Sequence, residues 1–158
     1  NRFSEEELLA YINRVKKALP GIPVGYVDAY YQFEKRSKLI DACDVILVNC
    51  YPFWEGCNID QSSIYLKQMY AVTQQFAKGK PVIITETGWP NKGDSLQSAK
   101  PTESNAMKYF IDSSNWAQKN EIPLFYFSSF DESWKVHHEG DVGARWGIWD
   151  KNEKLKFS

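Results

Sequence analysis

The sequence has little of what marks several large classes of protein. It holds only three cysteines and two histidines in 158 residues, with no CxxC pair, so a metal site is disfavoured. No run approaches the roughly 18 apolar residues that a membrane span needs. The 19 lysines and arginines nearly balance the 20 aspartates and glutamates, so the basic surface typical of nucleic-acid binding is missing. We therefore expect no metal, no membrane partner and no nucleic-acid partner.

Signatures of cofactor binding and of serine catalysis are missing too. The sequence has no GxGxxG after a strand, no P-loop and no GxSxG elbow. His137 and His138 are adjacent, and no serine is marked as their nucleophile. We therefore expect no cofactor. One disulfide among Cys43, Cys50 and Cys57 would leave a thiol over, so two states stay open: all three are reduced, or a cysteine partner lies outside this chain.

Aromatic residues, in contrast, are abundant. They make up 15% of the chain, with six tryptophans and nine tyrosines. Such rings fill protein cores, and they also stack on flat ligands such as the apolar faces of sugars. Composition alone favours the core, so the position of each ring along the chain has to decide between the two uses.

Helical and strand-like segments alternate along the chain. Helical spacing of apolar residues predicts helices at residues 4–19, 35–42, 61–77 and 102–119, the first with a Ser4–Glu7 capping box. Apolar, β-branched runs predict strands at residues 22–31, 44–54, 81–85 and 122–135. We expect 81–85 to be buried on both faces, 91–101 to form a loop and 147–150 a short return element. This order predicts a parallel sheet covered by helices.

Two architectures fit that order, a small doubly wound sheet and half of an eight-stranded (β/α)₈ TIM barrel. The chain opens on a helix, and four strands are few for a free-standing sheet. We therefore favour the barrel, with residues 1–158 as the C-terminal half of a single catalytic barrel that supplies strands five to eight. A half barrel leaves strand edges bare, so the missing N-terminal half is an expected partner.

Polar and aromatic residues gather where the predicted strands end. In parallel α/β folds these ends meet at one edge of the sheet, and function gathers there. Carboxylates and amides suit the hydroxyls of a neutral ring-shaped ligand, and aromatic rings suit its faces. The residues concerned are Asp28, Tyr30, Tyr31, Asn49, Tyr51, Phe53, Trp54, Glu86, Trp89, Phe130, Asp131, Glu132, Trp134 and Lys135.

Each of these residues also has a purely structural interpretation. Glu86 can cap the following loop, Asp28 and Asn49 can satisfy loop backbone, and Glu132 can form a surface pair with Lys135. Taken together at one edge, they favour a binding cleft. With cofactor and serine chemistry disfavoured, carboxylate chemistry on a carbohydrate remains. A retaining glycosidase needs two carboxyl groups, one as nucleophile and one as proton shuttle.

The segment VIITETGWP (residues 82–90) resembles the nucleophile motif of glycoside hydrolase family 17, the β-1,3-glucanases and β-1,3-glucanosyltransferases. Supporting matches are VNCYPFW (48–54), NAMKYF (105–110), FSSFDESWK (127–135) and RWGIWD (145–150). The resemblance covers nearly the whole chain, with the blocks in the order that the family has them. The residues of these blocks are most similar to those of the fungal branch.

The resemblance implies a (β/α)₈ barrel that acts on β-1,3-glucan, with Glu86 at the end of the seventh strand as the nucleophile. It places Tyr51 close to that nucleophile, and it makes Glu132, Lys135 and Glu139 residues that line the site. Trp54, Trp89 and Trp134 become candidates for sugar contacts. A secreted or cell-wall location is also implied.

One part of the family pattern has no counterpart in the sequence. The resemblance implies an acid/base glutamate, from an Asn-Glu pair at the end of the fourth strand, which would lie just before residue 1. Three interpretations remain: an enzyme whose acid/base lies outside this chain, an enzyme that uses Glu132 instead, and a non-catalytic β-glucan-binding fragment. The sequence does not separate hydrolysis from transglycosylation.

Overall fold

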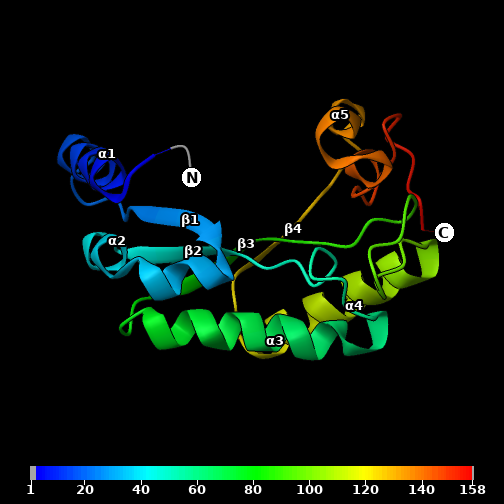
Figure 1. Ribbon diagram of the computed structural model, residues 1–158, viewed down its shortest axis with the longest axis horizontal. Coiled ribbons are helices and arrows are strands. Elements are labelled where there is room, and N and C mark those ends of the chain that lie inside the picture. Colours follow the sequence, from blue (N-terminus) through cyan, green and yellow to red (C-terminus); the bar gives the residue numbers. More distant parts are fainter. Residues whose placement is uncertain (1–2, 158) are drawn as a thin grey trace. The chain divides into compact units, whose positions relative to one another are not determined.

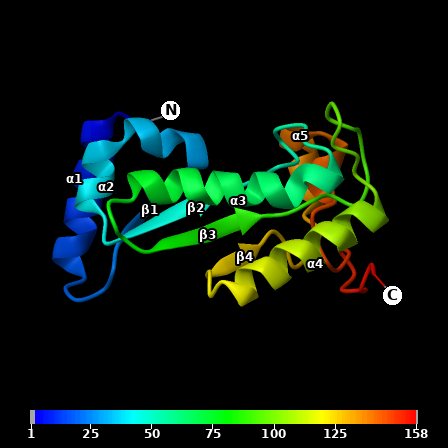
Figure 2. The ribbon, with the colours of Figure 1, turned by 90° about the horizontal axis from the view of Figure 1, so that it is seen from below.

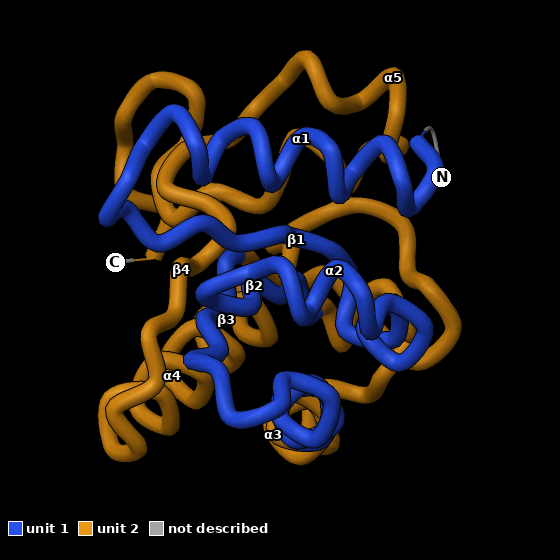
Figure 3. Tube along the Cα trace, turned by 90° about the vertical axis from the view of Figure 1, so that its left-hand side faces the viewer, with its two compact units in different colours: residues 1–50, 68–85 blue, residues 51–67, 86–158 orange. Residues whose placement is uncertain are grey.

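The structure, a computed structural model, describes residues 3–157. Its helices and strands alternate along the chain (Figure 1). The chain divides into two compact units, unit 1 with residues 1–50 and 68–85, and unit 2 with residues 51–67 and 86–158 (Figure 3). Helix α3 (Ile59–Phe76) and strand β3 (Val82–Thr87) each contribute residues to both units.

Unit 1 contains α1 (Glu5–Ala18), β1 (Gly25–Ala29), the 3₁₀ helix η1 (Tyr30–Lys35), α2 (Ser37–Ala42) and β2 (Val45–Asn49). Strands β1 and β2 run parallel, with Ala29 opposite Asn49 at their carboxyl ends. The backbone N–H of Ile46 donates to the carbonyl of Pro81 at 2.9 Å, which brings the start of β3 beside β2. Helices α1 and α2 lie side by side (Figure 2).

Helix α1 begins where the sequence predicts. The Glu7 N–H donates to Ser4 Oγ at 3.2 Å, and the Ser4 N–H donates to Glu7 Oε2 at 2.8 Å. This reciprocal pair satisfies two backbone donors that a helix N-terminus leaves without partners. The capping box predicted from Ser4 and Glu7 is therefore confirmed.

Unit 2 contains α4 (Glu103–Lys119), β4 (Leu124–Tyr126), the 3₁₀ helix η2 (Ser133–Lys135), α5 (Val136–Glu139) and the 3₁₀ helix η3 (Asp141–Ala144). Helix α4 lies along β4, where the rings of Phe110 and Tyr126 meet edge to face at 4.9 Å (Figure 2). The N–H of Phe127 donates to the carbonyl of Thr87 at 2.7 Å, so the end of β3 is bonded to the residue after β4.

The four strands follow one another in the order β1-β2-β3-β4. Helical segments rather than tight turns join successive strands, as parallel pairing requires. All four predicted helices and all four predicted strands occur, so the predicted α/β class with a parallel sheet is confirmed.

The strands are shorter than predicted, most of all the segment 122–135. Its strand is limited to Leu124–Tyr126, because the chain then leaves the sheet and bonds to the segment 146–149. The N–H of Ser128 donates to the Trp146 carbonyl at 3.1 Å, and the N–H of Trp149 donates to the Ser129 carbonyl at 2.9 Å. Trp149 also bridges Phe130 and Leu155, which confirms a short return element there.

Two further predictions about strands need correction. The segment 44–54 is a strand only as far as Asn49, and residues 52–56 form turns. In β3, Val82 and Ile84 are buried but Ile83 is half-buried, so the prediction of burial on both faces is wrong. The side chains of a strand alternate between its two faces, and in β3 only one face carries the fully buried aliphatic residues.

Each unit has its own core. In unit 1 the fully buried residues include Phe33, Leu39 and Ile46. In unit 2 the aromatic rings of Phe53, Trp89, Tyr109 and Trp146 pack together, with Phe53 in edge-to-face contact with Trp89 at 5.3 Å and with Trp146 at 5.5 Å. A large part of the aromatic content is therefore core.

Two further features concern the cysteine thiols and the apolar character of the helices. All three cysteines are free thiols, and burial raises the pKa of Cys50 to about 12, which keeps that thiol protonated and unreactive at neutral pH. None of the helices formed by residues 3–157 has the length and apolar character to cross a membrane.

Candidate active site

Glu86 lies at the second-to-last position of β3, and a tyrosine holds its carboxylate. The Tyr51 hydroxyl donates to Glu86 Oε2 at 2.9 Å. Burial raises the pKa of Tyr51, and the neighbouring charge of Glu86 raises it further. The phenol therefore keeps its proton and acts as a fixed donor. Strand and hydrogen bond together orient the carboxylate.

The turn after Glu86 depends on Gly88. A Cβ at this position would lie 1.9 Å from the carbonyl oxygen of Phe127, far inside van der Waals contact. Only glycine allows the two backbones to approach this closely. The glycine in the TGWP motif thus brings Phe127 next to the residues that follow Glu86.

Trp89, in the same motif, is not a sugar-contact residue in this structure. It is 1% exposed, and its indole N–H donates to the Lys100 carbonyl at 3.0 Å. It packs against Phe53 and Tyr109 in the core of unit 2. The expectation that it offers an indole face to the ligand is therefore wrong. Trp89 is a core residue that packs beneath the turn after Glu86 and has almost no exposed surface.

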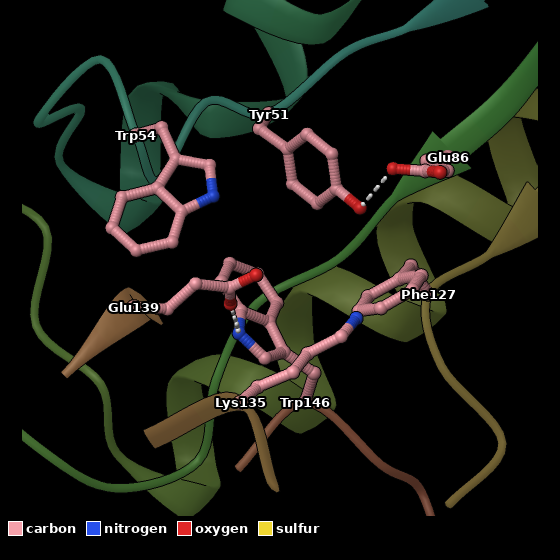
Figure 4. Close-up of a pocket in the computed structure, with 7 residues that line it drawn as sticks. All are labelled: Tyr51, Trp54, Glu86, Phe127, Lys135, Glu139 and Trp146. Carbon is pink, nitrogen blue, oxygen red and sulfur yellow. Dashed lines mark hydrogen bonds between the residues drawn. The ribbon is translucent and has the colours of Figure 1, made fainter. Parts of the chain in front are cut away.

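The Glu86 side chain lines a pocket of about 210 Å³ that is formed entirely by residues of unit 2 (Figure 4). The pocket combines two carboxylates, an ammonium group, a phenol and three further aromatic rings. Its lining residues are Tyr51, Trp54, Glu86, Phe127, Lys135, Glu139 and Trp146.

Lys135 brings a positive charge to the pocket. Its Nζ lies 2.7 Å from Glu132 Oε2 and 3.9 Å from the centre of the Phe127 ring. Glu132 itself is not among the lining residues. It contributes to the site only through its ion pair with Lys135. The structural interpretation of Glu132 allowed a surface pair with Lys135; the pair does form, but the Lys135 side chain is only 14% exposed. Trp134 is 61% exposed and lies outside the lining.

Glu139 and two tryptophans form the other side of the pocket. The Trp146 indole N–H donates to Glu139 Oε2 at 3.2 Å, and the Trp146 ring meets the Tyr51 ring edge on at 5.4 Å. Trp54 is tilted against Trp146 at 5.5 Å and is 41% exposed. Trp146 therefore serves as a buried wall, whereas Trp54 presents ring surface that a ligand can cover.

Asp28 and Asn49, the two predicted site residues in unit 1, have partners within that unit. The Tyr26 hydroxyl donates to Asp28 Oδ2 at 2.5 Å, and the Ala29 N–H donates to Asp28 Oδ1 at 2.8 Å. The Thr85 hydroxyl donates to Asn49 Oδ1 at 2.8 Å. Neither residue lines the pocket of Figure 4, and their role in substrate binding stays a prediction.

Phe127 and Trp146 line the pocket but were not singled out from the sequence. Phe127 is the first residue after β4, so the strand-end rule applied to the true end of that strand would have found it. Trp146 lies in an irregular segment, and only its place in the RWGIWD block pointed to it. Across residues 3–157 no three His, Cys, Asp or Glu side chains are grouped as metal ligands.

Comparison with known proteins assigns the chain to a family. Residues 1–147 match the BtgE/BtgC glycoside hydrolase domain. A glucan 1,3-β-glucosidase from Arthroderma benhamiae is 31% identical over 99% of this chain and 56% of the relative. A cell surface mannoprotein from Candida albicans is 30% identical over 90% of this chain and 39% of the relative.

Comparison with solved structures points to related enzymes. The glycoside hydrolase family 17 β-1,3-glucanosyltransferase from Rhizomucor miehei matches with a TM-score of 0.91 at 33% identity, over 98% of this chain and 56% of that one. An active-site mutant of the same enzyme, in complex with laminaritriose, gives a TM-score of 0.90. The chain thus spans about half the length of these relatives, which confirms the expectation that it carries about half of the barrel fold. The chain belongs to the family of BtgE/BtgC glycoside hydrolase domains and is related to the enzymes of glycoside hydrolase family 17.

Proposed function

We propose that the whole protein is a retaining glycosidase or transglycosylase that acts on β-1,3-glucan, with Glu86 as its nucleophile. The observation that carries this proposal is the carboxylate of Glu86 at a strand end, held by Tyr51 and facing an aromatic-lined pocket. The named activities of the relatives support the same substrate class. The laminaritriose complex of the Rhizomucor miehei enzyme supports it further.

In this mechanism the Glu86 carboxylate attacks the anomeric carbon of a glucosyl unit. The bond from that carbon to the leaving oxygen breaks as an acid delivers a proton to the oxygen, and a glycosyl ester forms on Glu86. The same acid group, now deprotonated, takes a proton from water or from the hydroxyl of a second sugar, whose oxygen attacks the same carbon as the bond to Glu86 breaks. Two inversions give net retention, and the attacking group decides between hydrolysis and transfer.

The acid must lie about 5–5.5 Å from the nucleophile in a retaining enzyme. We propose that it is a glutamate from a part of the protein outside this sequence, as the family resemblance implies. Glu132 suits the task poorly, because it is paired with Lys135 and does not line the pocket. Glu139 does line the pocket, but it accepts the indole N–H of Trp146, and we assign it to holding a sugar hydroxyl.

The remaining pocket residues suit the binding of a neutral sugar. Trp54 and Phe127 offer ring faces for stacking, and Lys135 offers N–H donors to hydroxyl groups. For the protein we propose a cell-wall location, where β-1,3-glucan would be met. The cell surface mannoprotein among the relatives supports this location.

The substitution Glu86→Gln in the full-length protein tests the proposal, because it keeps the shape of the side chain and removes the nucleophilic charge. We expect kcat on laminarin to fall by about a thousandfold or more, with binding of laminari-oligosaccharides preserved. Asp112→Asn, on the exposed face of α4, is the matched control and should keep full activity. Near-normal hydrolysis by the Glu86 variant would refute the assignment.

Two readouts of the same assay resolve the finer points. The anomeric form of the first product, followed by NMR, should match that of the substrate if the mechanism is retaining. Products longer than the substrate indicate transfer. Full-length protein that binds laminari-oligosaccharides but never releases a product would instead support a non-catalytic glucan-binding role.

A further inference from the structure

Trp146 is a wall of the pocket, yet it lies outside any helix or strand. It is 2% exposed and contacts the rings of Tyr51, Phe53 and Phe127. Its backbone lies in the irregular segment 145–147. The backbone of such a segment is not held by a regular ladder of helix or sheet hydrogen bonds, so groups that bond to it on both sides of Trp146 help to fix the position of this side chain.

The residue before Trp146 is held by Lys156. The Lys156 ammonium group donates to the Arg145 carbonyl at 3.3 Å, and the same carbonyl accepts the N–H of Asn91 at 3.0 Å. Lys156 also donates to Asn91 Oδ1 at 2.8 Å. Three acceptors thus surround this group: the Arg145 carbonyl, the Asn91 amide and a carboxylate oxygen of Asp131.

The residue after Trp146 is held by the same network. Lys156 Nζ lies 2.8 Å from Asp131 Oδ1, and this oxygen accepts the N–H of Gly147 at 3.0 Å. The side chains of Lys156 and Asp131 are only 10% and 6% exposed. One buried ion pair therefore anchors the backbone on both sides of Trp146.

We propose that Lys156 is a positioning residue, which fixes the Trp146 wall of the pocket through Asp131 and the Arg145 carbonyl. An ammonium group has three N–H donors, and here it meets three acceptors. The match to the family domain ends at residue 147, so Lys156 lies beyond the matched residues. Burial lowers the pKa of Lys156, and the nearby carboxylate of Asp131 opposes that effect, as expected for an ammonium group kept charged by its partner.

A general stabilising role is the competing explanation, because breaking any buried ion pair destabilises a protein. The two explanations differ in one respect. If Lys156 acts through Trp146, the substitutions Lys156→Met and Trp146→Phe affect the same pocket wall, so their effects will not add. If Lys156 only adds stability, it will affect kinetics equally whether or not the indole is present.

The first experiment is a double-mutant cycle in the full-length protein, with kcat and KM for laminari-oligosaccharides as the readouts; it rests on the proposed function. We expect Lys156→Met to lower kcat/KM by about tenfold, and by less than about threefold when Trp146→Phe is already present. Lys108→Met, which breaks an exposed ion pair on α4, is the matched control and should change neither value. Effects that add across the cycle would overturn the proposal.

The second experiment needs no substrate, so it remains informative if the proposed function fails. The tryptophans of the full-length protein are labelled with 5-fluorotryptophan, and the ¹⁹F signal of Trp146 is assigned from its loss in Trp146→Phe. Lys156→Met should shift or broaden that signal and leave the signal of Trp116 on α4 unchanged. If Lys156→Met fails to fold, Lys156→Arg, which keeps the charge but not the three diverging donors, provides the same comparison. An unchanged Trp146 signal in a folded variant would refute the positioning role.

Discussion

The two units contain the same chemical pair in two different settings. In unit 1 the Tyr26 hydroxyl donates to Asp28, and in unit 2 the Tyr51 hydroxyl donates to Glu86. Both carboxylates lie at or next to the carboxyl end of a parallel strand. The other oxygen of Asp28 accepts the N–H of the adjacent Ala29, whereas Glu86 lines a pocket with aromatic rings and a lysine. A tyrosine–carboxylate pair at a strand end is therefore not enough to mark an active site; its surroundings distinguish the two.

The sharpest test of this contrast is to remove each phenol oxygen in turn. Tyr51→Phe takes a fixed donor from the proposed nucleophile, and loss of one such donor typically costs about a hundredfold in kcat. Tyr26→Phe should leave kcat within about twofold and lower the free energy of unfolding by about 1 kcal/mol. Steady-state kinetics on laminarin and urea unfolding of the full-length proteins measure the two effects.

Either of two results would change the comparison. Equal losses of kcat in the two variants would indicate that Asp28 also takes part in the catalytic site, as the sequence predicts. Unaltered kcat in Tyr51→Phe would mean that the bond to Glu86 has no part in turnover.

A smaller effect is expected from the two lysine–carboxylate pairs of unit 2. Lys135 pairs with Glu132 at 2.7 Å and lines the pocket, and Lys108 pairs with Asp112 at the same distance on the exposed face of α4. Lys135→Met should raise KM for laminari-oligosaccharides and lower kcat/KM by about ten- to thirtyfold, because the pocket loses its ammonium donors and the half-buried Glu132 carboxylate is left unpaired. Lys108→Met should have no measurable effect. A KM unchanged by Lys135→Met would exclude the lysine from sugar binding.

Parts of the fold that depend on local sequence were predictable. The capping box at Ser4 and Glu7 formed as expected, and Thr102 caps α4 by accepting the N–H of Asn105 at 3.2 Å. The apolar run of β3 also placed Glu86 correctly at a strand end. In each case the determining residues are neighbours in sequence, so pattern and propensity are informative.

Parts that depend on distant residues were not predictable. Strand β4 stops early because Ser128 bonds to Trp146, eighteen positions further on. Trp146 lines the pocket because Lys156 and Asp131 hold its neighbours. Trp89 and Trp54 look alike in sequence, yet one is 1% exposed and the other 41%. Only packing in three dimensions separates a core ring from a ring at the pocket.

The smallest expected effect concerns pH and again compares the two tyrosines. Burial raises the pKa of Tyr26 from 10.0 to about 12, with further contributions from its bond to Asp28 and from the charge of Asp28. Below pH 10 the phenol is neutral in both the folded and the unfolded protein, so its contribution to stability is complete. Between pH 10 and about 12 the unfolded chain loses this proton first, so stability falls as pH rises through that window.

Tyr26→Phe removes the titrating group, so the free energy of unfolding of this variant should fall less steeply above pH 10 than that of the parent protein. Part of the Tyr26 side chain faces water, which screens the charge of Asp28, so the difference in slope should stay below the value for one full proton. Asp28→Asn removes that charge but leaves burial in place, and it should therefore have an intermediate slope. Urea unfolding at several pH values between 9 and 11.5, about the window set by these two pKa values, measures all three proteins. Parallel curves would mean that the Tyr26–Asp28 pair does not favour the protonated phenol. The pair in unit 1 would then differ from Tyr51 and Glu86, where burial and the neighbouring carboxylate both raise the pKa of the phenol.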